Sequence, residues 1–329
     1  MSDSFFVVIN PNAGKRRAEK DWHLILSLLL NSGIKFNHKF TTHKLHANTI
    51  TTEAIGKGFR KFIAIGGDGT FNEVTNAIFS QKTCPASEIK FGVICVGTGN
   101  DWCRTLGIPN DYNSAVEIIK AGNTSLFDVG LAHFNNDKMK SSRYFVNVAG
   151  MGFDAMVAKK VNEDKDSNRT GKILYLKNLF LCLLKSKAIN CSIQIDDANT
   201  IPCNSEQCHP ERSRRNSRRI SIEAPIFSIS VGIGKYNGGG MMQLPNAIAD
   251  DGLLDITLIK KISRFDVIMQ TKNLYDGTFI KHPSVALYQG KKVLIEAEEP
   301  VGIELDGEYV GNTPVEFEVL PRVLRVFVK

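Results

Sequence analysis

The sequence has little that would stabilise the protein through disulfides or zinc. Its 329 residues include seven cysteines, an odd number, and no C-x-x-C pair. We therefore predict neither a disulfide framework nor a zinc site, and we expect the cysteines to be reduced thiols. Cys203, Cys208 and His209 lie close together in the sequence, but no matching second pair accompanies them, so we interpret this grouping as incidental.

No apolar run is long enough to cross a membrane. The nearest candidate, residues 173–189, is interrupted by three lysines, whereas a spanning helix needs about 20 mostly apolar residues. The N-terminus also lacks the basic region and apolar core of a signal peptide. We therefore expect a cytoplasmic protein.

The positive charge is too small to indicate nucleic acid binding. The net charge is +7, and five of the arginines lie between residues 212 and 219. No basic stretch is interleaved with aromatic residues, so we expect no nucleic acid partner, whereas a nucleotide or an anionic membrane surface fits. The Arg-rich segment, residues 203–219, lacks apolar periodicity and is predicted to be a disordered loop. Binding of anionic lipid headgroups is the alternative.

Three widespread nucleotide-binding signatures are missing as well. The sequence contains no G-x-x-x-x-G-K-[ST], no G-x-G-x-x-G and no H-R-D, which excludes the common kinase folds. The hydrophobic content of 43% and charged content of 23% are those of an ordinary globular protein. At this length, two domains are expected.

The N-terminal part of the chain alternates strands with helices. Apolar runs at residues 5–9, 61–65 and 91–96 are of the kind that is buried on both faces of a parallel sheet, and residues 34–41 favour a further strand. Between these strands, helical patterns cover residues 22–30, 47–56, 72–79 and 114–121. This alternation predicts an α/β nucleotide-binding domain with a parallel sheet and flanking helices.

The pattern changes near residue 128. Strand-like stretches then follow at residues 127–134, 144–148, 189–195, 226–231 and 254–259. We predict an α/β domain over residues 1–128 and a mostly antiparallel β domain over residues 129–314. The last strands, residues 315–329, are expected to return to the first domain.

Two further helical patterns have alternative interpretations. Residues 263–275 carry Phe265, Ile268, Met269 and Leu274 at near-helical spacing, which predicts a packed face and only secondarily a lipid contact. Residues 172–187 place leucines beside lysines. This pattern fits a helix on a bilayer surface and, equally, a core helix whose lysines reach solvent.

The chain is organised around the glycine-rich turn at residues 65–73, between a strand and a helix. We predict that Gly66, Gly67 and Gly69 take positive φ, which would turn their N–H groups into a nest for phosphate beside a helix N-terminus. The carboxylate of Asp68 would repel phosphate unless it holds a metal or orients a hydroxyl, so Mg²⁺ is implied. A tight turn with a capping aspartate is the alternative.

Two other polar loops follow strands of the predicted parallel sheet. Asn10-Pro11 comes after the first strand, and Gly97-Thr98-Gly99-Asn100-Asp101 comes after residues 91–96. Ligands of open α/β sheets bind beyond the carboxyl ends of the strands. The loops that follow Ile9, Ile65 and Val96 should therefore meet in one crevice.

Taken with these loops, the chain resembles the diacylglycerol kinase catalytic-domain family, of the bacterial soluble kind that is also similar to sphingosine and ceramide kinases. The resemblance covers nearly the whole chain. It is carried in order by Asn10-Pro11, GGDGTFNEV at 66–74, GTGND at 97–101, FVNVAGMGFDA at 145–155, DDGLLD at 250–255 and LDGE at 305–308. It implies a kinase that uses ATP and Mg²⁺ to phosphorylate a lipid hydroxyl, as a peripheral protein at the inner membrane face.

The resemblance also implies the residues of the site. A metal site would use Asp251 with the carbonyls of Ile248 and Leu253, although Asp-Asp-Gly by itself favours a hairpin. The residues implied to bind ATP are Asn10, Pro11, Thr42, Gly66, Gly67, Asp68, Gly69, Thr70, Phe71, Asn72, Glu73, Gly97, Thr98 and Asn100.

The LDGE stretch carries the implied catalytic carboxylates. Together with Asp68, Asp306 and Glu308 would be catalytic, with Glu308, or Asp306 beside it, accepting the proton of the acceptor hydroxyl. Asp306-Gly307 alone predicts a type I′ hairpin turn. If the strand continues instead, both carboxylates share a face, whereas a turn makes them diverge and leaves only one to serve. The active site is expected in a cleft between the domains that closes over the reactants.

Two other functions compete with the lipid kinase. An NAD kinase shares the GGDGT turn, but GTGND and LDGE belong to the lipid kinase pattern. A nucleotide- or lipid-binding protein without turnover is the other alternative, and the intact acidic positions Asp68, Asp251, Asp306 and Glu308 argue against it. A homodimer is the general expectation for a soluble enzyme, although no stretch identifies an interface.

Overall fold

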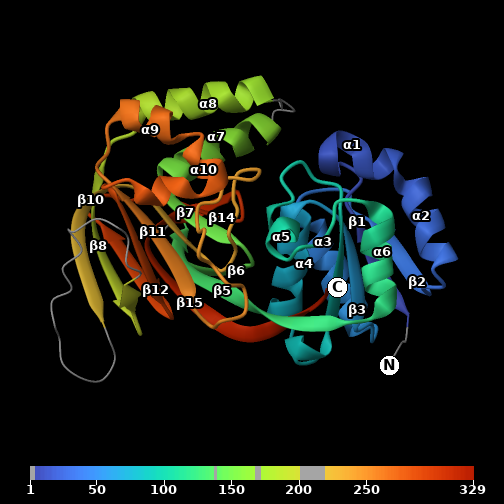
Figure 1. Cartoon of the computed structure of the whole chain (residues 1–329). Coiled ribbons are helices and arrows are strands. Elements are labelled where there is room, and N and C mark those ends of the chain that lie inside the picture. Colours follow the sequence, from blue (N-terminus) through green and yellow to red (C-terminus); the bar gives the residue numbers. More distant parts are fainter. Residues whose placement is uncertain (1–3, 137–138, 167–171, 201–218) are drawn as a thin grey trace.

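The computed structural model describes residues 4–136, 139–166, 172–200 and 219–329. Two sheet-based halves lie side by side, the N-terminal half in blue and cyan and the C-terminal half mainly in green, yellow and orange (Figure 1). Of the Arg-rich segment, only Arg219 is described, and its guanidinium pairs with Asp196 at 2.6 Å. The prediction of a disordered loop at residues 203–218 therefore lies outside the described residues.

The N-terminal half is built on four parallel strands. The order across the sheet is β2-β1-β3-β4, and each neighbouring pair runs parallel. The strands are β1 (Phe5–Ile9), β2 (Phe36–Phe40), β3 (Lys61–Gly66) and β4 (Lys90–Cys95).

Helices cover both faces of this sheet, because successive side chains of a strand point to opposite faces. Ile9 and Ile63 face the layer that contains α2 (Trp22–Asn31) and α6 (Tyr112–Ala121). Val8 and Phe62 face the layer that contains α3 (His46–Gly56) and α4 (Asp68–Ser80), so β1, β3 and β4 are mainly apolar, whereas the edge strand β2 carries the exposed Asn37, His38 and Lys39. The helices are α1 (Ala13–Lys20), α2 (Trp22–Asn31), α3 (His46–Gly56), α4 (Asp68–Ser80), α5 (Asp101–Thr105) and α6 (Tyr112–Ala121), with the 3₁₀ turn η1 (Ala86–Glu88).

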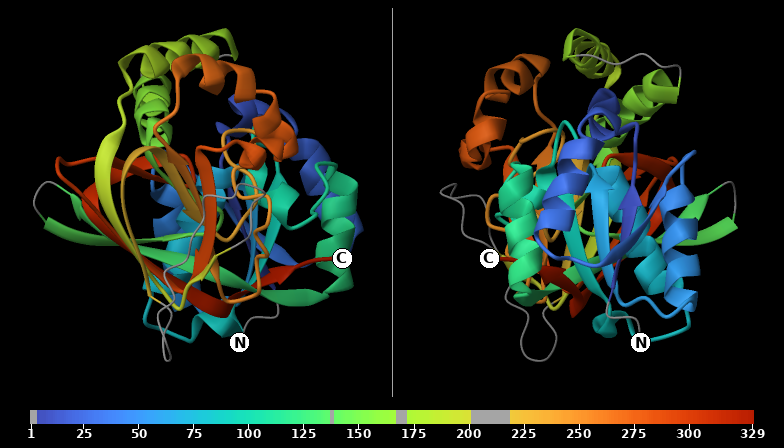
Figure 2. Two further views of the ribbon diagram at one scale, coloured as in Figure 1. Left: turned by 60° about the vertical axis from the view of Figure 1, so that its left-hand side comes forward. Right: turned by 90° about the vertical axis from the view of Figure 1, so that its right-hand side faces the viewer.

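The C-terminal half is mainly antiparallel, and its strands enclose a separate hydrophobic core. Its strands are β6 (Met139–Phe145), β7 (Val148–Gly152), β8 (Ile189–Asp196), β9 (Asn199–Thr200), β10 (Ile220–Gly232), β11 (Leu254–Lys260), β12 (Val285–Gly290), β13 (Lys292–Ala297) and β14 (Gly302–Leu305). Helices lie beyond one end of these strands (Figures 1 and 2). They are α7 (Phe153–Asp166), α8 (Lys172–Lys185), α9 (Arg264–Gln270) and α10 (Asn273–Asp276), with η2 (Thr278–Lys281).

Two long strands join the halves. β5 (Thr124–Asn136) and β15 (Glu308–Phe327) pair antiparallel along most of their length. Near the chain end, Arg325 and Val326 of β15 pair parallel with β4, so the C-terminus returns to the N-terminal sheet. A domain boundary at residue 128 therefore falls inside β5.

The prediction of a packed helical face over residues 263–275 is correct for Leu274, which packs against the cluster of Phe279, Val285 and Leu287, and wrong for its other three apolar residues. The stretch forms two short helices, α9 and α10, and the side chains of Phe265, Ile268 and Met269 are 69%, 52% and 60% exposed. Val267 packs inward, against the small cluster that includes Phe153 and Phe227. A helix at the end of a sheet has only one neighbour to cover it, so its outer apolar side chains remain in solvent.

Helix α8, within predicted residues 172–187, has one buried and one exposed apolar face. Cys182 and Leu183 are buried against Phe153 and Phe227, while Phe180, Leu181 and Leu184 are exposed. The helix therefore packs on the molecule through one face and leaves a second apolar face in solvent. No helix among the described residues has the length and apolar character needed to cross a membrane.

The expectation that every cysteine is a reduced thiol is also wrong. Cys95 ends β4, the chain reverses through the turn at residues 97–100, and α5 brings Cys103 back to it. The two sulfurs are bonded at 2.01 Å. Cys84, Cys182 and Cys191 are free, and Cys203 and Cys208 lie outside the described residues.

Candidate active site

The loops that follow β1, β3 and β4 meet at one edge of the N-terminal sheet, as their positions in the sequence predict. The amide of Asn10 donates to the hydroxyl of Thr70 at 3.0 Å. A Cβ atom built on Gly67 would lie 3.0 Å from the Cα of Gly97, and one built on Gly14 would lie 2.0 Å from the carbonyl oxygen of Val96. The first loop therefore contacts both of the others.

Gly66 and Gly67 of the central turn are required for space rather than for positive φ. Gly66, Gly67 and Gly69 are not among the residues with positive φ, so the predicted nest is wrong in its backbone conformation. A Cβ on Gly66 would lie 2.5 Å from the hydroxyl oxygen of Thr70. Gly66 and Gly67 thus allow the turn to pack against α4 and the loop after β4.

Helix α4 begins at Asp68, four residues earlier than predicted, with Gly67 as its N-cap. Thr70, Phe71 and Asn72 belong to its first turns and are buried. The ring of Phe71 packs against Trp102 with centroids 6.0 Å apart, so only the backbone of Phe71 is left for a ligand. The free N–H groups at the start of this 13-residue helix favour an anion there.

Glu73 binds the neighbouring helix. Its carboxylate accepts from the N–H groups of Leu45 and Ala47, each at 3.0 Å, and so caps the start of α3. An acceptor carboxylate used in this way holds the loop after β2 and is unsuited to contact phosphate directly. Thr42 lies in that loop, where its N–H donates to His46 Nδ1 at 3.0 Å.

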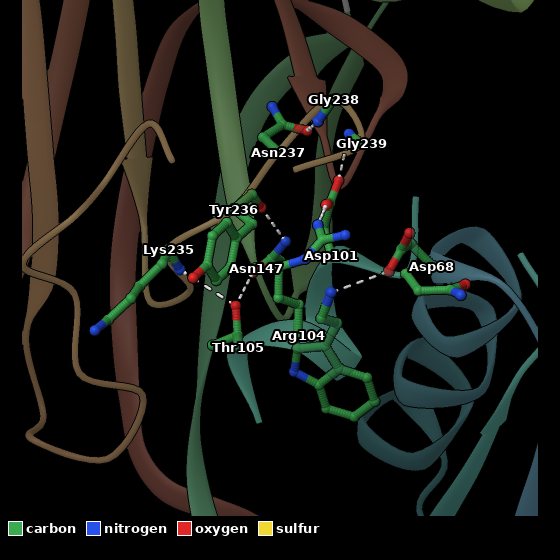
Figure 3. Close-up of polar contacts among 12 residues, drawn as sticks. Asp68, Asp101, Arg104, Thr105, Asn147, Lys235, Tyr236, Asn237, Gly238 and Gly239 are labelled. Carbon is green, nitrogen blue, oxygen red and sulfur yellow. Dashed lines mark hydrogen bonds and ion pairs between the residues drawn. The ribbon is translucent and has the colours of Figure 1, made fainter. Parts of the chain in front are cut away.

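Two carboxylates converge beside the turn after β4. A Cβ built on Gly99 would lie 3.2 Å from Asp68 Oδ2 and 3.3 Å from Asp101 Oδ2. Asp68 also accepts from the N–H of Trp102 at 3.1 Å (Figure 3). Burial raises the pKa of Asp68. Burial and the charge of Asp68 raise the pKa of Asp101 to about 6.

The remaining predicted residues of these loops differ in exposure. Thr98 is exposed, Pro11 is partly buried and Asn100 is buried. The side-chain oxygen of Asn100 has no hydrogen-bond partner in the described structure, while its amide donates to Asn110 at 3.0 Å. A buried acceptor without a partner is unusual, and this one would lie 2.6 Å from a Cβ built on Gly97.

Asp306 and Gly307 form the hairpin turn between β14 and β15, both with positive φ. Leu305 pairs with Glu308 across the turn, so Asp306 and Glu308 diverge and their roles separate. Asp306 Oδ1 accepts from the N–H groups of Asn147 and Val148 at 3.0 and 3.2 Å. Its Oδ2 accepts from the amide of Asn72 at 2.7 Å and the N–H of Val146 at 3.0 Å. Asp306 therefore joins α4 to the C-terminal half.

Glu308 is the carboxylate that faces the N-terminal half. Its side chain is 20% exposed, and Oε2 lies 2.7 Å from the ammonium of Lys44. Oε1 lies 3.9 Å from the position of a Cβ built on Gly69. Glu308 thus stands over the start of α4, whereas both oxygens of Asp306 are occupied by N–H donors.

A buried carboxylate, that of Glu304, stabilises the turn at Asp306 and Gly307. Glu304 of β14 is 1% exposed, and it accepts from the N–H of Gly307 at 2.6 Å and from the amide of Asn237 at 2.8 Å. Burial, together with the smaller effect of the nearby charge of Asp154, raises the pKa of Glu304 to about 8. The raised pKa favours the protonated form of Glu304 in the folded state at neutral pH.

We expect this proton to make stability depend on pH. Because the folded pKa lies above the unfolded value, the contribution of Glu304 is complete below about pH 4.5 and is lost as the pH rises through about 8. Thermal unfolding followed by circular dichroism should show Tm falling by a few degrees from pH 6 to pH 8 in the parent, a change on the order of 1–3 kcal/mol. The Tm of Glu304→Gln should fall less than that of the parent over the same pH range.

Glu299→Gln is the matched control, because Glu299 is exposed. It should keep the pH dependence of the parent. An equal slope for the parent and Glu304→Gln would show that Glu304 is not protonated in the folded protein.

Sequence reasoning missed a second set of contacts between the halves (Figure 3). The N–H of Gly239 donates to Asp101 at 2.7 Å, and the guanidinium of Arg104 lies 5.2 Å from the ring centroid of Tyr236. Thr105 of α5 also donates to Asn147 at 3.1 Å. Gly238, Gly239 and Gly240 all have positive φ, and three consecutive glycines were a signal that could have identified this loop.

The predicted metal residues lie at a different place. Asp251 accepts from the N–H of Leu253 at 3.0 Å, and Ile248 is exposed. Asp128 of β5 accepts from the N–H of Gly252 at 2.7 Å. Burial, and to a smaller extent the charge of Asp251, raises the pKa of Asp255 to about 7. The described residues contain no group of three or more His, Cys, Asp or Glu side chains able to hold a metal, so any cation here would rely on carbonyl oxygens as well.

Comparisons with known proteins agree with this architecture. Residues 4–132 match the family model of the diacylglycerol kinase catalytic domain. Residues 147–328 match that of the YegS C-terminal NAD kinase beta sandwich-like domain. Two relatives from Staphylococcus aureus, strains RF122 / ET3-1 and MRSA252, are diacylglycerol kinases that are 28% identical over 98% of this chain and 91% of their own length.

Solved structures share the fold. A Bacillus anthracis str. Sterne protein superposes with a TM-score of 0.73 at 22% identity over 99% of this chain and 97% of its own. A second structure from that organism, described as a diacylglycerol kinase, gives a TM-score of 0.67 at 20% identity. The family models, which together cover both halves, show that this chain belongs to the diacylglycerol kinase family of lipid kinases.

Proposed function

We propose that this protein transfers the γ-phosphate of ATP, with Mg²⁺, to a hydroxyl of a diacylglycerol-like or sphingoid lipid. The observation that carries the proposal is the position of Glu308. It comes from the C-terminal half and stands over the first turn of α4, 3.9 Å from a Cβ built on Gly69. A proton acceptor is thereby placed beside free helix N–H groups that favour phosphate.

The acidic residues fit a magnesium-dependent reaction. Two carboxylate oxygens, Asp68 Oδ2 and Asp101 Oδ2, face the same point near Gly99, and like charges so placed are stabilised by a divalent cation. Asp68 would hold Mg²⁺, which would offset the charge that develops on the transferred phosphoryl group. Asp101 lies beside it, with Oδ1 2.7 Å from the guanidinium of Arg104 and Oδ2 accepting from the N–H of Gly239. Asp251, with the carbonyls of Ile248 and Leu253, is proposed as a separate structural cation site.

Different residues of the chain perform different steps of phosphoryl transfer. The helix N-terminus and the loops after β1 and β4 position the nucleotide, and Asp306 fixes the turn that carries Glu308. Glu308 takes the proton of the acceptor hydroxyl while the oxygen of that hydroxyl bonds to the γ-phosphorus. The bond between the γ-phosphorus and the bridging oxygen breaks, and ADP leaves with its electrons.

Exposed apolar side chains support an acceptor at a membrane surface. Phe180, Leu181 and Leu184 of α8 are exposed, as are Phe265 and Met269 of α9. Both helices lie beyond the same end of the C-terminal strands (Figure 2). Apolar patches of this kind mark lipid or protein contacts, so we propose peripheral association with the inner face of the membrane.

Transfer of label from γ-labelled ATP tests the proposal. The acceptor panel contains diacylglycerol, monoacylglycerol, a sphingoid base, ceramide and NAD, with lipids extracted into an organic phase. Label in that phase supports a lipid kinase and identifies the acceptor class. Label on NAD alone would favour an NAD kinase, an alternative that the description of the family model for the C-terminal domain raises. Absence of transfer to every acceptor would favour a binding protein without turnover.

A further inference from the structure

Lys44 makes a contact that the proposed mechanism does not yet use. Its ammonium lies 2.7 Å from Glu308 Oε2, with the two side chains 58% and 20% exposed. The lysine comes from the loop between β2 and α3, and the glutamate comes from the start of β15. In the described structure, the group that contacts this carboxylate oxygen is therefore a cation from the opposite half.

The loop that carries Lys44 is held in place by several groups. The residue after it, Leu45, has φ of +63°, a left-handed conformation that costs energy for any residue other than glycine. The carboxylate of Glu73 accepts from the N–H groups on either side of His46, those of Leu45 and Ala47, at 3.0 Å. Strain of this kind persists only where surrounding contacts impose it, so these contacts give the loop a defined conformation.

The location of this loop brings Lys44 to the predicted phosphate site. β2, β1, β3 and β4 are parallel, so the loop after β2 lies at the same sheet edge as the loops after β1, β3 and β4. Glu73, which holds it, belongs to α4, whose first turn faces Glu308. A cation here can reach either the Glu308 carboxylate or an anion at the start of α4.

The pair between Lys44 and Glu308 is suited to exchange. An ion pair with a half-exposed ammonium contributes little to stability, and a terminal phosphate carries more negative charge than one carboxylate. Glu308, in turn, can accept a proton from a hydroxyl more readily when it is not bound to an ammonium.

We propose that Lys44 is a catalytic residue that alternates between two partners, the Glu308 carboxylate in the free enzyme and the γ-phosphate of the bound nucleotide. This inference rests on the proposed function. Binding of ATP then moves Lys44 to the phosphate and frees Glu308. The acceptor O–H gives its proton to Glu308, the oxygen bonds to phosphorus, and the bond to the bridging oxygen breaks with its electrons going to ADP. Lys44 remains protonated throughout.

Nucleotide binding measured by titration calorimetry tests this inference without turnover. The probes are ADP and the non-hydrolysable ATP analogue AMP-PNP, each with Mg²⁺. Lys44→Met should weaken AMP-PNP binding by about tenfold or more, the value of a hydrogen bond to a charged group, and leave ADP within about twofold. Lys44→Arg keeps the charge and should restore most of the preference for AMP-PNP.

Glu308→Gln provides the second half of the test. Because Lys44 would no longer be held by Glu308, this variant should bind AMP-PNP more tightly than the parent, while ADP is unchanged. The double variant of Lys44→Met and Glu308→Gln should bind like Lys44→Met alone. Lys39→Met is the matched control, because Lys39 pairs with Glu53 at 3.3 Å on the same side of the sheet and should change neither affinity.

The outcomes separate this inference from the proposed function. Equal losses for ADP and AMP-PNP in Lys44→Met, or no loss at all, would overturn the γ-phosphate contact. The absence of a gain in Glu308→Gln would overturn the exchange of partners. A parent protein that binds neither nucleotide would instead overturn the proposed function itself.

Discussion

Glu308→Gln is expected to lower kcat by about 10²–10⁴-fold, the usual contribution of a positioned general base. The amide cannot accept the proton of the acceptor hydroxyl, but it preserves the size of the side chain. The KM for the lipid should change little, because Glu308 acts on the proton that moves in the transition state. Steady-state transfer from γ-labelled ATP to the preferred lipid measures both constants.

Glu318→Gln is the matched control for this substitution. Glu318 lies on the same strand, β15, and pairs with His133 at 3.5 Å, away from Glu308. The kcat of Glu318→Gln should equal that of the parent. Retention of full activity in Glu308→Gln would show that another group takes the proton.

Asp306→Asn is expected to lower stability as well as activity. Four N–H groups donate to the two oxygens of Asp306. In asparagine, one oxygen becomes an NH₂ group that faces donors, so at least one buried donor loses its partner. A cost on the order of 2–4 kcal/mol follows, together with loss of the geometry that holds Glu308.

Thermal and urea unfolding followed by circular dichroism measure this effect. The midpoint should fall clearly below that of the parent, whereas Glu308→Gln should unfold near the parent midpoint. Loss of activity with an unchanged midpoint for Asp306→Asn would mean that Asp306 acts chemically and does not fix the turn. The pair of variants therefore separates the anchor of the turn from the base.

The different roles of Asp306 and Glu308 could not be predicted from the sequence. Asp306-Gly307 predicts a hairpin turn by local preference alone, and the structure confirms that turn. Which of the two carboxylates remains free depends on Asn72, Val146 and Asn147, residues more than 150 positions away in the chain. No local pattern encodes such contacts.

The glycine turn illustrates a second limit. Its place after a buried strand predicts both the turn and the following helix, and both are present. The reason for its glycines was predicted wrongly, because the close approach of Gly67 to Gly97 is a tertiary contact. Positive φ and lack of space both favour glycine, and sequence alone does not distinguish them.

The exposed faces of α8 and α9 show the same limit for apolar patterns. Spacing predicts an apolar face on a helix, but burial depends on what packs against that face. Val267 and Leu183 have neighbours, whereas Phe265 and Phe180 point to solvent. The disulfide between Cys95 and Cys103 similarly depends on the reversal of the chain between β4 and α5.

The sequence by itself determined the alternation of strands and helices, the apolar strands, the polar loops at one sheet edge and the family. These features follow from local periodicity, turn chemistry and short motifs, which neighbouring residues set. Only the tertiary structure decided which carboxylates converge and which face the other half of the molecule. It placed Asp101 beside Asp68 and Lys44 beside Glu308, because distances between remote segments arise from packing of the whole chain.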